Sequence, residues 1–262
     1  MNPIFGLNQL SILAADPLTH VLDQKYDALK SLGITKHVTM MLAAAAICLI
    51  VFPLVARRIA SDRPGRLGMF FEAILLFVRD EMARPFLGKD AERFLPVIWS
   101  FFFFILFCNL LGMIPLPFMG TATGNINVTV ALATVAFCTY HFVGIRENGL
   151  LHYAKANLLV GPWFLWPLMV PLELLGHAIK PSALAIRLFA NMMGGHIMLA
   201  VVIGFTGVFT FDNLVMGGAV AAAAVGGALF LNVLELLVAC IQAFIFTYLT
   251  TVFLSMALHP DH

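Results

Sequence analysis

The segment from Leu214 to Leu258 contains no proline and only one charged residue, Glu235. As a helix it would be roughly 67 Å long at ~1.5 Å per residue, whereas the hydrocarbon core of a bilayer is about 30 Å thick. The preceding apolar block, residues 158–209, is also too long for one perpendicular crossing. Each block therefore either turns back within the membrane or lies steeply tilted. Steep tilting suits a helix laid along another membrane object rather than one surrounded by lipid.

Composition is typical of a protein that crosses a membrane several times. Hydrophobic residues make up 61% of the 262 residues and charged residues only 11%. No basic stripe stands apart from the membrane-flanking loops, so we expect no nucleic-acid partner. The four cysteines lie in apolar runs without a C-x-x-C pair, which predicts free thiols and no disulfide framework. We expect no cofactor and no metal.

The hydropathy pattern predicts an all-α integral membrane protein with about five membrane-embedded helices and one surface helix. The expected spans are residues 38–56, 94–118 and 128–145, followed by a long tilted hairpin of residues 158–209 and 214–258. Residues 67–86 mix apolar and charged side chains, which predicts an amphipathic helix on the bilayer surface. A solvated loop packed on a partner is the alternative for that segment.

The distribution of positive charge predicts the topology. Eight of the fifteen Lys and Arg residues lie between Arg57 and Arg93, directly after the first span. By the positive-inside rule this region is cytoplasmic, so residues 1–37 lie outside the cytoplasm. Residues 1–37 also lack the basic start and short apolar core of a cleavable signal peptide. Residues 259–262 then form a cytoplasmic tail.

Arg187 lies within an otherwise apolar stretch, residues 182–191. A guanidinium does not lose its proton in proteins, and placing it at mid-membrane costs roughly 3 kcal/mol on insertion scales. Such a residue predicts a functional site on an ion pathway. The alternative is an arginine that reaches the lipid headgroups from a helix end, but the apolar sequence continues beyond it to Phe209.

Helical spacing assigns the other polar residues of the two long blocks to faces. On an ideal helix Asn191 lies within about 40° of the Arg187 direction, whereas His196 points about 180° away. Glu235 and Gln242 are seven residues apart and share one face. If the two blocks pack antiparallel, Gln242 reaches toward Arg187 while Glu235 meets His196.

Two segments carry a specific resemblance: Pro181-Ser-Ala-Leu-Ala-Ile-Arg-Leu-Phe-Ala-Asn-Met-Met-Gly-Gly-His196, and Cys240-Ile-Gln-Ala-Phe-Ile-Phe-Thr-Tyr-Leu249. Both resemble subunit a of F-type ATP synthases. The similarity extends to Asn109-Leu-Leu-Gly-Met-Ile-Pro115, to Asn127-Val-Thr129 and to Glu173, fourteen residues before the arginine. From about residue 38 to 258 the order of elements fits that family.

The resemblance implies a stator that passes protons to and from a rotating ring of small hairpin subunits, the c-ring. Arg187 would face the ring, favour the ionised form of each ring carboxylate and block a direct leak between two half-channels. Other implied partners are the b-type peripheral stalk subunits and membrane lipid. Such a subunit has no ATP site and is a non-catalytic, ion-translocating part of an enzyme complex.

The resemblance also implies roles for the remaining polar residues. His196 and Glu235 would form an interacting pair in an aqueous half-channel, although a buried and satisfied histidine is the alternative. Gln242 would orient Arg187 by a hydrogen bond, and Asn191 would line the same seam or only pack. Glu173 would belong to the cytoplasmic half-channel, with His177 and Lys180 flanking its mouth.

Two positions depart from the family pattern. Gly112 stands where some bacterial relatives have an acid, and Asn125 occupies a position that is often acidic. The sequence therefore does not define the route from the periplasmic side, whereas the position of the arginine is unaffected. The sequence also does not define which ion is transported, although the pairing of His196 with Glu235 favours protons over sodium.

Two other classes of protein remain as alternatives. A secondary transporter would use Arg187 to bind an anionic substrate, but the broken helices and internal repeats of that class are not evident. An intramembrane enzyme would need a catalytic motif, and the chain has neither H-E-x-x-H nor G-x-S-x-G.

Overall fold

The computed structural model describes residues 36–59, 65–113, 121–158, 163–209 and 214–259. Most of the expected extracytoplasmic segment, residues 1–37, and most of the tail, residues 259–262, lie outside the described residues. Within the described residues the chain is helical and contains no strand, which confirms the all-α prediction. The main helices are α3 (Lys36–Ile59), α4 (Arg66–Phe77), α6 (Ala91–Gly112), α7 (Ile126–Asn148), α8 (Leu150–Leu158), α9 (Trp166–Phe209) and α10 (Leu214–Leu258).

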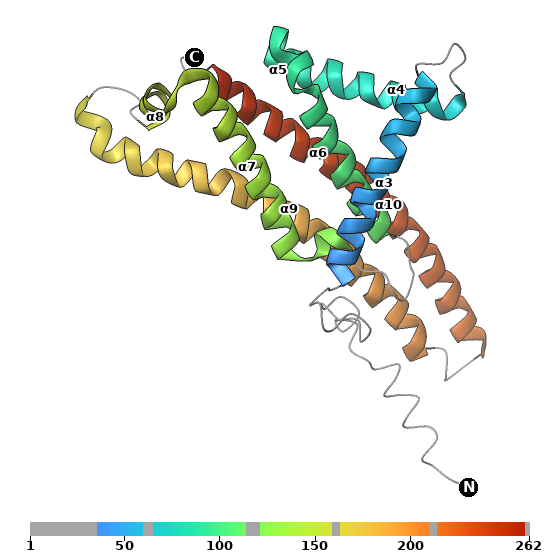
Figure 1. The fold of residues 1–262 in the computed structure, drawn as a ribbon. Coiled ribbons are helices and arrows are strands. Elements are labelled where there is room, and N and C mark those ends of the chain that lie inside the picture. The colour runs from blue at the N-terminus through green and yellow to red at the C-terminus, as the bar shows by residue number, and fades with distance from the viewer. Residues whose placement is uncertain (1–35, 60–64, 114–120, 159–162, 210–213, 260–262) are drawn as a thin grey trace, which may run out of the picture.

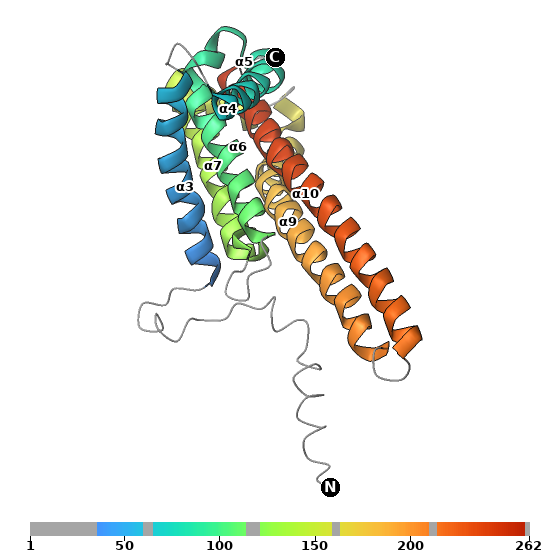
Figure 2. The same ribbon diagram turned by 90° about the vertical axis from the view of Figure 1, so that its right-hand side faces the viewer.

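The helices form two groups that cross each other. Helices α3 and α6 stand side by side, and α9 and α10 form a long hairpin that runs obliquely past them, with α10 packed against both α6 and α7 (Figures 1 and 2). Helix α10 runs unbroken over 45 residues, so the glycine pairs at residues 217–218 and 226–227 do not interrupt it. This block is therefore one continuous helix that does not turn back, and its tilt in the membrane stays a prediction.

Four helical stretches within the described residues are long and apolar enough to cross a membrane: His37–Arg58, Arg66–Gly112, Ile126–Asn148 and Ala222–Leu258. Helix α9 is not among these four. It carries five ionisable residues, Glu173, His177, Lys180, Arg187 and His196. Its polarity fits a helix that is shielded from lipid by protein or lines a polar path.

The surface segment predicted at residues 67–86 is helical but not one straight helix. Helix α4 ends at Phe77, a π-helical turn covers Val78–Ala83, and the four-residue helix α5 covers Arg84–Leu87. Pro85 has no amide hydrogen to donate, which disfavours a regular α-helical ladder through this region. In Figure 1, α4 runs crosswise to α3 and α6.

Aromatic side chains of α6 fill the core between α6, α7 and α10. Phe101, Phe102 and Phe103 are all buried, so this phenylalanine run faces neighbouring helices rather than lipid. Phe101 lies 6.1 Å from Phe246 of α10, measured between ring centroids. Full burial of each such ring contributes about 2 kcal/mol relative to exposure in water, although lipid would supply part of the same gain.

One end of the molecule is joined by polar contacts between elements distant in sequence. Arg93 of α6 pairs with Glu147 of α7 at 2.6 Å. Asn148 donates a hydrogen bond of 2.9 Å to the carbonyl of Ala257, and Ser255 donates one of 2.7 Å to the carbonyl of Phe86. These bonds hold the ends of α5, α7 and α10 together where the basic residues gather.

Candidate functional site

The register of the α9–α10 hairpin is set by three close approaches. Asn191 contacts Gln242, Gly195 contacts Glu235, and Gly227 contacts Val202. The contacts advance along α9 as they retreat along α10, which is antiparallel packing. On α10 the facing stripe includes Ala239 and Ala243, both fully buried, and these small side chains allow the helices to approach closely.

Arg187 lies on the exposed side of α9. Its neighbours Leu184, Leu188 and Met192 are buried against the rest of the molecule, whereas Arg187 itself is exposed. No described residue makes a hydrogen bond or ion pair with its guanidinium. An unpaired cation beside apolar side chains, such as Ile186 at 57% exposure, is poorly placed to face lipid. The arrangement instead suits an anionic partner on another subunit.

Helix α10 also leaves an apolar row uncovered. Its exposed large side chains follow helical spacing along one side: Leu229, Phe230, Val233, Leu237 and Ile241. The hairpin thus offers a long apolar face in which Arg187 is a charged position.

Asn191 and Gln242 form the polar contact closest to Arg187. The Asn191 Nδ2 donates a 2.9 Å hydrogen bond to the Gln242 Oε1, and Gln242 is 2% exposed. Helical spacing predicted that Gln242 reaches toward Arg187, but its hydrogen bond is with Asn191, one helical turn further on. The Gln242 Nε2 has no hydrogen-bond partner among the described residues and remains available to donate to a water.

His196 and Glu235 meet across the hairpin as the spacing predicted. The His196 Nε2 lies 3.8 Å from the Glu235 Oε1, too far for a direct hydrogen bond. Neither atom has another hydrogen-bond partner among the described residues. Gly195 makes room for the carboxylate, because a Cβ there would lie 2.8 Å from the Glu235 Oε1. A bridging water would satisfy both buried atoms.

A further set of polar residues, which the sequence analysis did not select, lies where the C-terminal end of α6 meets the N-terminal end of α3. Asn109 is fully buried, donates a 3.3 Å hydrogen bond to the carbonyl of Ala239 and accepts one of 2.8 Å from Thr123. His37, also buried, pairs with the carbonyl of Thr121 and lies near enough to His196 to interact with it electrostatically. The sequence feature that could have identified His37 is the presence of a histidine at the start of an apolar span.

The two departures from the family pattern have structural causes. A Cβ at Gly112 would lie 2.2 Å from the Thr121 Cγ2 and 3.0 Å from its Cα, so no larger residue fits the observed packing. Asn125 caps α7, since its Oδ1 accepts a 2.9 Å hydrogen bond from the amide of Asn127. Thr123 and His37 supply polar groups in this region in place of the missing acids.

The opposite end of α9 gathers another set of polar residues. Glu173, His177 and Lys180 follow one another at about one turn each, and both charged residues interact electrostatically with His177. The structure adds His141 of α7 and Tyr153 of α8, which the sequence reasoning did not select. Tyr153 lies in the loop helix between the spans, and burial raises the pKa of its hydroxyl to about 12.

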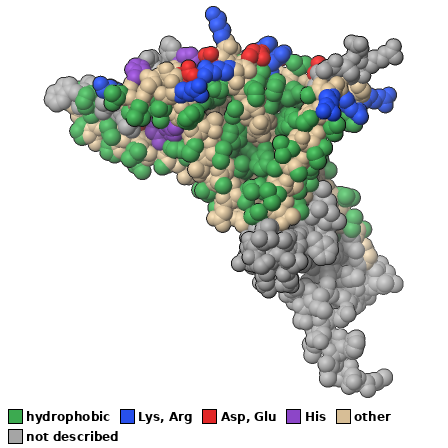
Figure 3. Space-filling model, in the orientation of Figure 1, with side chains coloured by type: hydrophobic (Ala, Val, Ile, Leu, Met, Phe, Trp, Pro, Cys, Tyr) green, Lys and Arg blue, Asp and Glu red, His purple; other side chains and the backbone are tan. Residues whose placement is uncertain are grey.

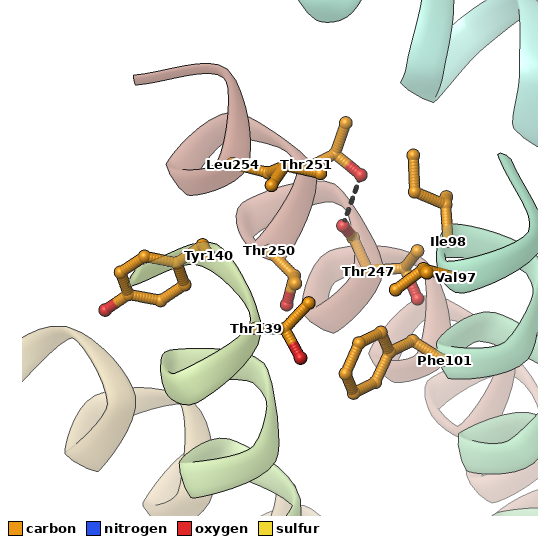
Figure 4. Close-up of a pocket in the computed structure, with 9 residues that line it drawn as sticks. All are labelled: Val97, Ile98, Phe101, Thr139, Tyr140, Thr247, Thr250, Thr251 and Leu254. Atoms are coloured by element: carbon orange, nitrogen blue, oxygen red, sulfur yellow. Dashed lines mark hydrogen bonds between the residues drawn. The ribbon is translucent and has the colours of Figure 1, made fainter. Parts of the chain in front are cut away.

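A cavity of about 260 Å³ between α6, α7 and α10 is not part of this site. Figure 4 shows it lined by threonines of α10 and by apolar side chains such as Phe101 and Leu254. Thr250 and Thr251 donate their hydroxyls to main-chain carbonyls of their own helix, at 2.8 and 2.9 Å. Those two hydroxyls are therefore occupied, whereas the buried Thr247 Oγ1, which also lines the cavity, has no hydrogen-bond partner among the described residues.

The described residues contain no group of three His, Cys, Asp or Glu side chains suited to holding a metal ion. Titratable side chains occur instead as pairs and short rows along α9, with Arg187 between a set at each end. Such an arrangement can pass protons by short steps at both ends while the central cation blocks direct passage.

Comparison with known proteins adds a family. Residues 38–255 match the family described as ATP synthase A chain. The chain is 42% identical over 246 residues to ATP synthase subunit a of Myxococcus xanthus, covering 90% of this chain and 78% of that protein. It is 39% identical over 237 residues to ATP synthase subunit a of Chloroherpeton thalassium, covering 88% and 68%. It is 38% identical over 237 residues to ATP synthase subunit a 2 of Chlorobaculum tepidum, and there the chain spans 65% of the relative's length.

Proposed function

The chain belongs to the ATP synthase A chain family, and from this membership we propose that it is the stator subunit that carries protons to and from a rotating ring. Two offset half-channels lead to the ring, and Arg187 couples proton flow to rotation. The observation that carries the proposal is the exposed, unpaired guanidinium on the apolar face of a long oblique hairpin. That face is the docking surface for the c-ring.

The physical role of Arg187 follows from its charge. A cation about 4 Å from a ring carboxylate, at an effective dielectric constant of about 20, stabilises the ionised form by roughly 4 kcal/mol, equivalent to about three pKa units. A proton bound to the carboxylate must therefore leave before that site passes the arginine. The same cation repels protons in the gap, so protons cross only by riding the ring.

The half-channel from outside runs along His196, Glu235, His37 and Asn109. Support comes from the 3.8 Å gap between His196 and Glu235 and from their unsatisfied buried atoms, which suit a hydrogen-bonded water. Gln242 and Asn191 close this path on the side of Arg187. The cytoplasmic half-channel opens at the other end of α9, beside Glu173 with His177 and Lys180 at its mouth.

Energy coupling explains why a ring is needed. Each proton crossing 100 mV releases about 2.3 kcal/mol, so several crossings must be added together to drive the synthesis of one ATP. In this account the chain sits in a bacterial inner membrane with its N-terminus in the periplasm and its C-terminus in the cytoplasm. Peripheral stalk subunits of the b type hold it against the torque of the ring, and protons are the transported ion.

The test is ATP-driven proton pumping and ATP synthesis in membrane vesicles carrying Arg187→Ala, after immunoblotting shows that the complex assembles. We expect both activities to fall below about 1% of wild type, because the coupling charge is gone. The control is Val135→Ala, at an exposed position of α7 outside the hairpin, which should keep most activity. Near-normal pumping by Arg187→Ala would contradict the proposal and favour a transporter that uses the arginine for an anionic substrate.

A further inference from the structure

Histidine side chains gather at the end of the molecule that carries the lysines and arginines, as Figure 3 shows. Two of them belong to one cluster with a tyrosine. The Tyr153 Oη lies 2.8 Å from the His141 Nδ1, and the His141 and His177 rings are 5.1 Å apart between centroids. These three residues come from α8, α7 and α9, so the cluster exists only in the folded chain.

Several polar atoms of this cluster are buried without a partner. The Tyr140 Oη, the His141 Nε2 and the His177 Nδ1 make no hydrogen bond with any described residue. Buried polar groups are nearly always paired, by protein or by ordered water. Tyr140, Tyr153, His177 and Lys180 line a cleft of about 270 Å³, which includes the space at its open mouth. The space that water centres can occupy in the cleft is about 20 Å³, enough for one or two waters that would satisfy some of these atoms.

The charged groups that face the cluster come from one helix. Lys180 and Glu173 both interact electrostatically with His177, and Lys180 also interacts with His141. The Lys180 Nζ lies over the Phe253 ring, 5.5 Å from its centroid. The side chains that α10 contributes to the cleft, Phe253, Met256 and Ala257, carry no charge.

The cleft is connected to the coupling residue by the geometry of α9. Lys180 precedes Arg187 by seven residues, about 10 Å along the helix axis, and points within about 20° of the same direction. Glu173 lies on the same stripe, within about 40°. A proton that reaches Lys180 in the cleft is therefore about two helical turns from Arg187, along the same face of α9.

We propose that Tyr153, His141 and His177 form a proton relay that collects protons at the cytoplasmic surface and delivers them, through water in the cleft, to the Arg187 face of α9. The inference rests on the proposed function and adds a defined entry route. The buried Tyr153, which lines the cleft, takes a proton at its hydroxyl from a water in the cleft as it gives its own to the His141 Nδ1. The His141 Nε2 then releases a proton through a buried water to the neighbouring His177, which passes it on. Each residue gains one proton and loses one, so no charge or electron accumulates.

The test is the pH profile of ATP-driven pumping in inverted vesicles of the whole complex, where the cytoplasmic face contacts the assay buffer. Tyr153→Phe removes the hydroxyl but keeps the ring, which packs directly over Gly144. His141→Gln combined with His177→Gln removes both imidazoles. The control is His152→Gln, an exposed histidine next to Tyr153 in the same loop helix.

A relay matters most when protons are scarce. At about pH 8.5 we expect Tyr153→Phe to pump about threefold more slowly than wild type and the double histidine variant about tenfold more slowly, less than the ~10²-fold typical of lost acid–base catalysis because water still delivers protons. At about pH 6 the rates should converge with that of wild type, and His152→Gln should match wild type throughout.

Rates equal to wild type at every pH would overturn the relay, and so would a loss of the same proportion at every pH, which is the mark of a structural defect. These outcomes are separate from failure of the proposed function. If Arg187→Ala abolishes pumping while the cluster variants pump normally at about pH 8.5, only the entry route is wrong. If Arg187→Ala pumps normally, the stator assignment itself fails.

Discussion

The Asn191 Nδ2 donates a 2.9 Å hydrogen bond to the buried Gln242 Oε1, one helical turn from Arg187. This bond joins the two long helices on the side of the hairpin where Arg187 must hold a fixed position. This neutral amide pair, of which Gln242 is buried and Asn191 exposed, can fix the spacing of the helices without competing for the arginine charge.

Gln242→Leu therefore leaves the Asn191 amide without its acceptor at nearly constant side-chain volume. Because Asn191 is exposed, water can replace the lost acceptor, and the loss costs about 0.5–1.5 kcal/mol. We expect assembled complexes whose ATP-driven pumping is about fivefold slower, measured by quenching of a pH-sensitive dye. Val135→Ala, at an exposed position of α7 outside the hairpin, is the control for truncation in general. Equal pumping by Gln242→Leu and wild type would show that the amide pair only packs.

Gly195 provides the space for Glu235. An alanine Cβ would lie 2.8 Å from the Glu235 Oε1, so the carboxylate must turn away from its place opposite His196. We expect Gly195→Ala to lower pumping about tenfold while the complex still assembles, because one methyl group displaces a side chain end rather than the backbone. Gly226 on α10 has open space where a Cβ would lie, so the control variant Gly226→Ala should pump normally.

Normal pumping by Gly195→Ala would contradict this prediction. It would mean that the position of the Glu235 carboxylate relative to His196 does not limit proton flow. A loss of assembly in both glycine variants would instead indicate that helix packing alone is at stake.

The tight contact between Gly112 and Thr121 predicts that an acid is not tolerated there. Gly112→Asp forces overlap with both the side chain and the Cα of Thr121, and overpacking of this kind costs about 1–3 kcal/mol or more. We expect the membrane content of the subunit, measured by immunoblotting, to fall at least about threefold. Adding Thr121→Gly removes the two closest overlaps and should restore part of it. Full assembly of Gly112→Asp alone would contradict the observed packing.

Two exposed cysteines allow the ring-facing side to be mapped. Cys240 lies on α10 beside the apolar row, whereas Cys138 lies on α7. With a cysteine placed near the carboxylate of the ring subunit, a short bifunctional maleimide should join that subunit to Cys240 and not to Cys138. Adducts at Cys138 alone would place the ring on another face.

Much of the fold follows from periodicity and length. An apolar block without proline, from Leu214 to Leu258, is long enough to predict one long helix that is tilted in the membrane, and α10 is indeed one continuous helix. The spacing of Glu235 and Gln242 also predicted that His196 and Glu235 meet. Local pattern did not reveal how the amide of Gln242 is used, because a difference of one helical turn decides between Arg187 and Asn191 as its neighbour.

Contacts between elements that are distant in the sequence could not be predicted from local sequence pattern. His141 and Tyr153 flank a turn at Gly149, and their approach to His177 depends on how α7 packs against α9. His37 reaches the His196 region only because α3 stands beside the end of α6. Each is a lone polar residue in an apolar or loop context, where pattern alone gives no partner.

The central claim, that Arg187 both couples and insulates, is tested most directly by measuring passive proton leak together with coupled activity. Vesicles are stripped of the soluble catalytic sector, and proton uptake under an imposed potential is followed for wild type, Arg187→Ala and Arg187→Lys. The account predicts that Arg187→Ala loses ATP synthesis yet leaks protons at least as fast as wild type, while Arg187→Lys, which keeps the charge, leaks less than Arg187→Ala. A variant without the arginine that is sealed to protons and still synthesises ATP would contradict it.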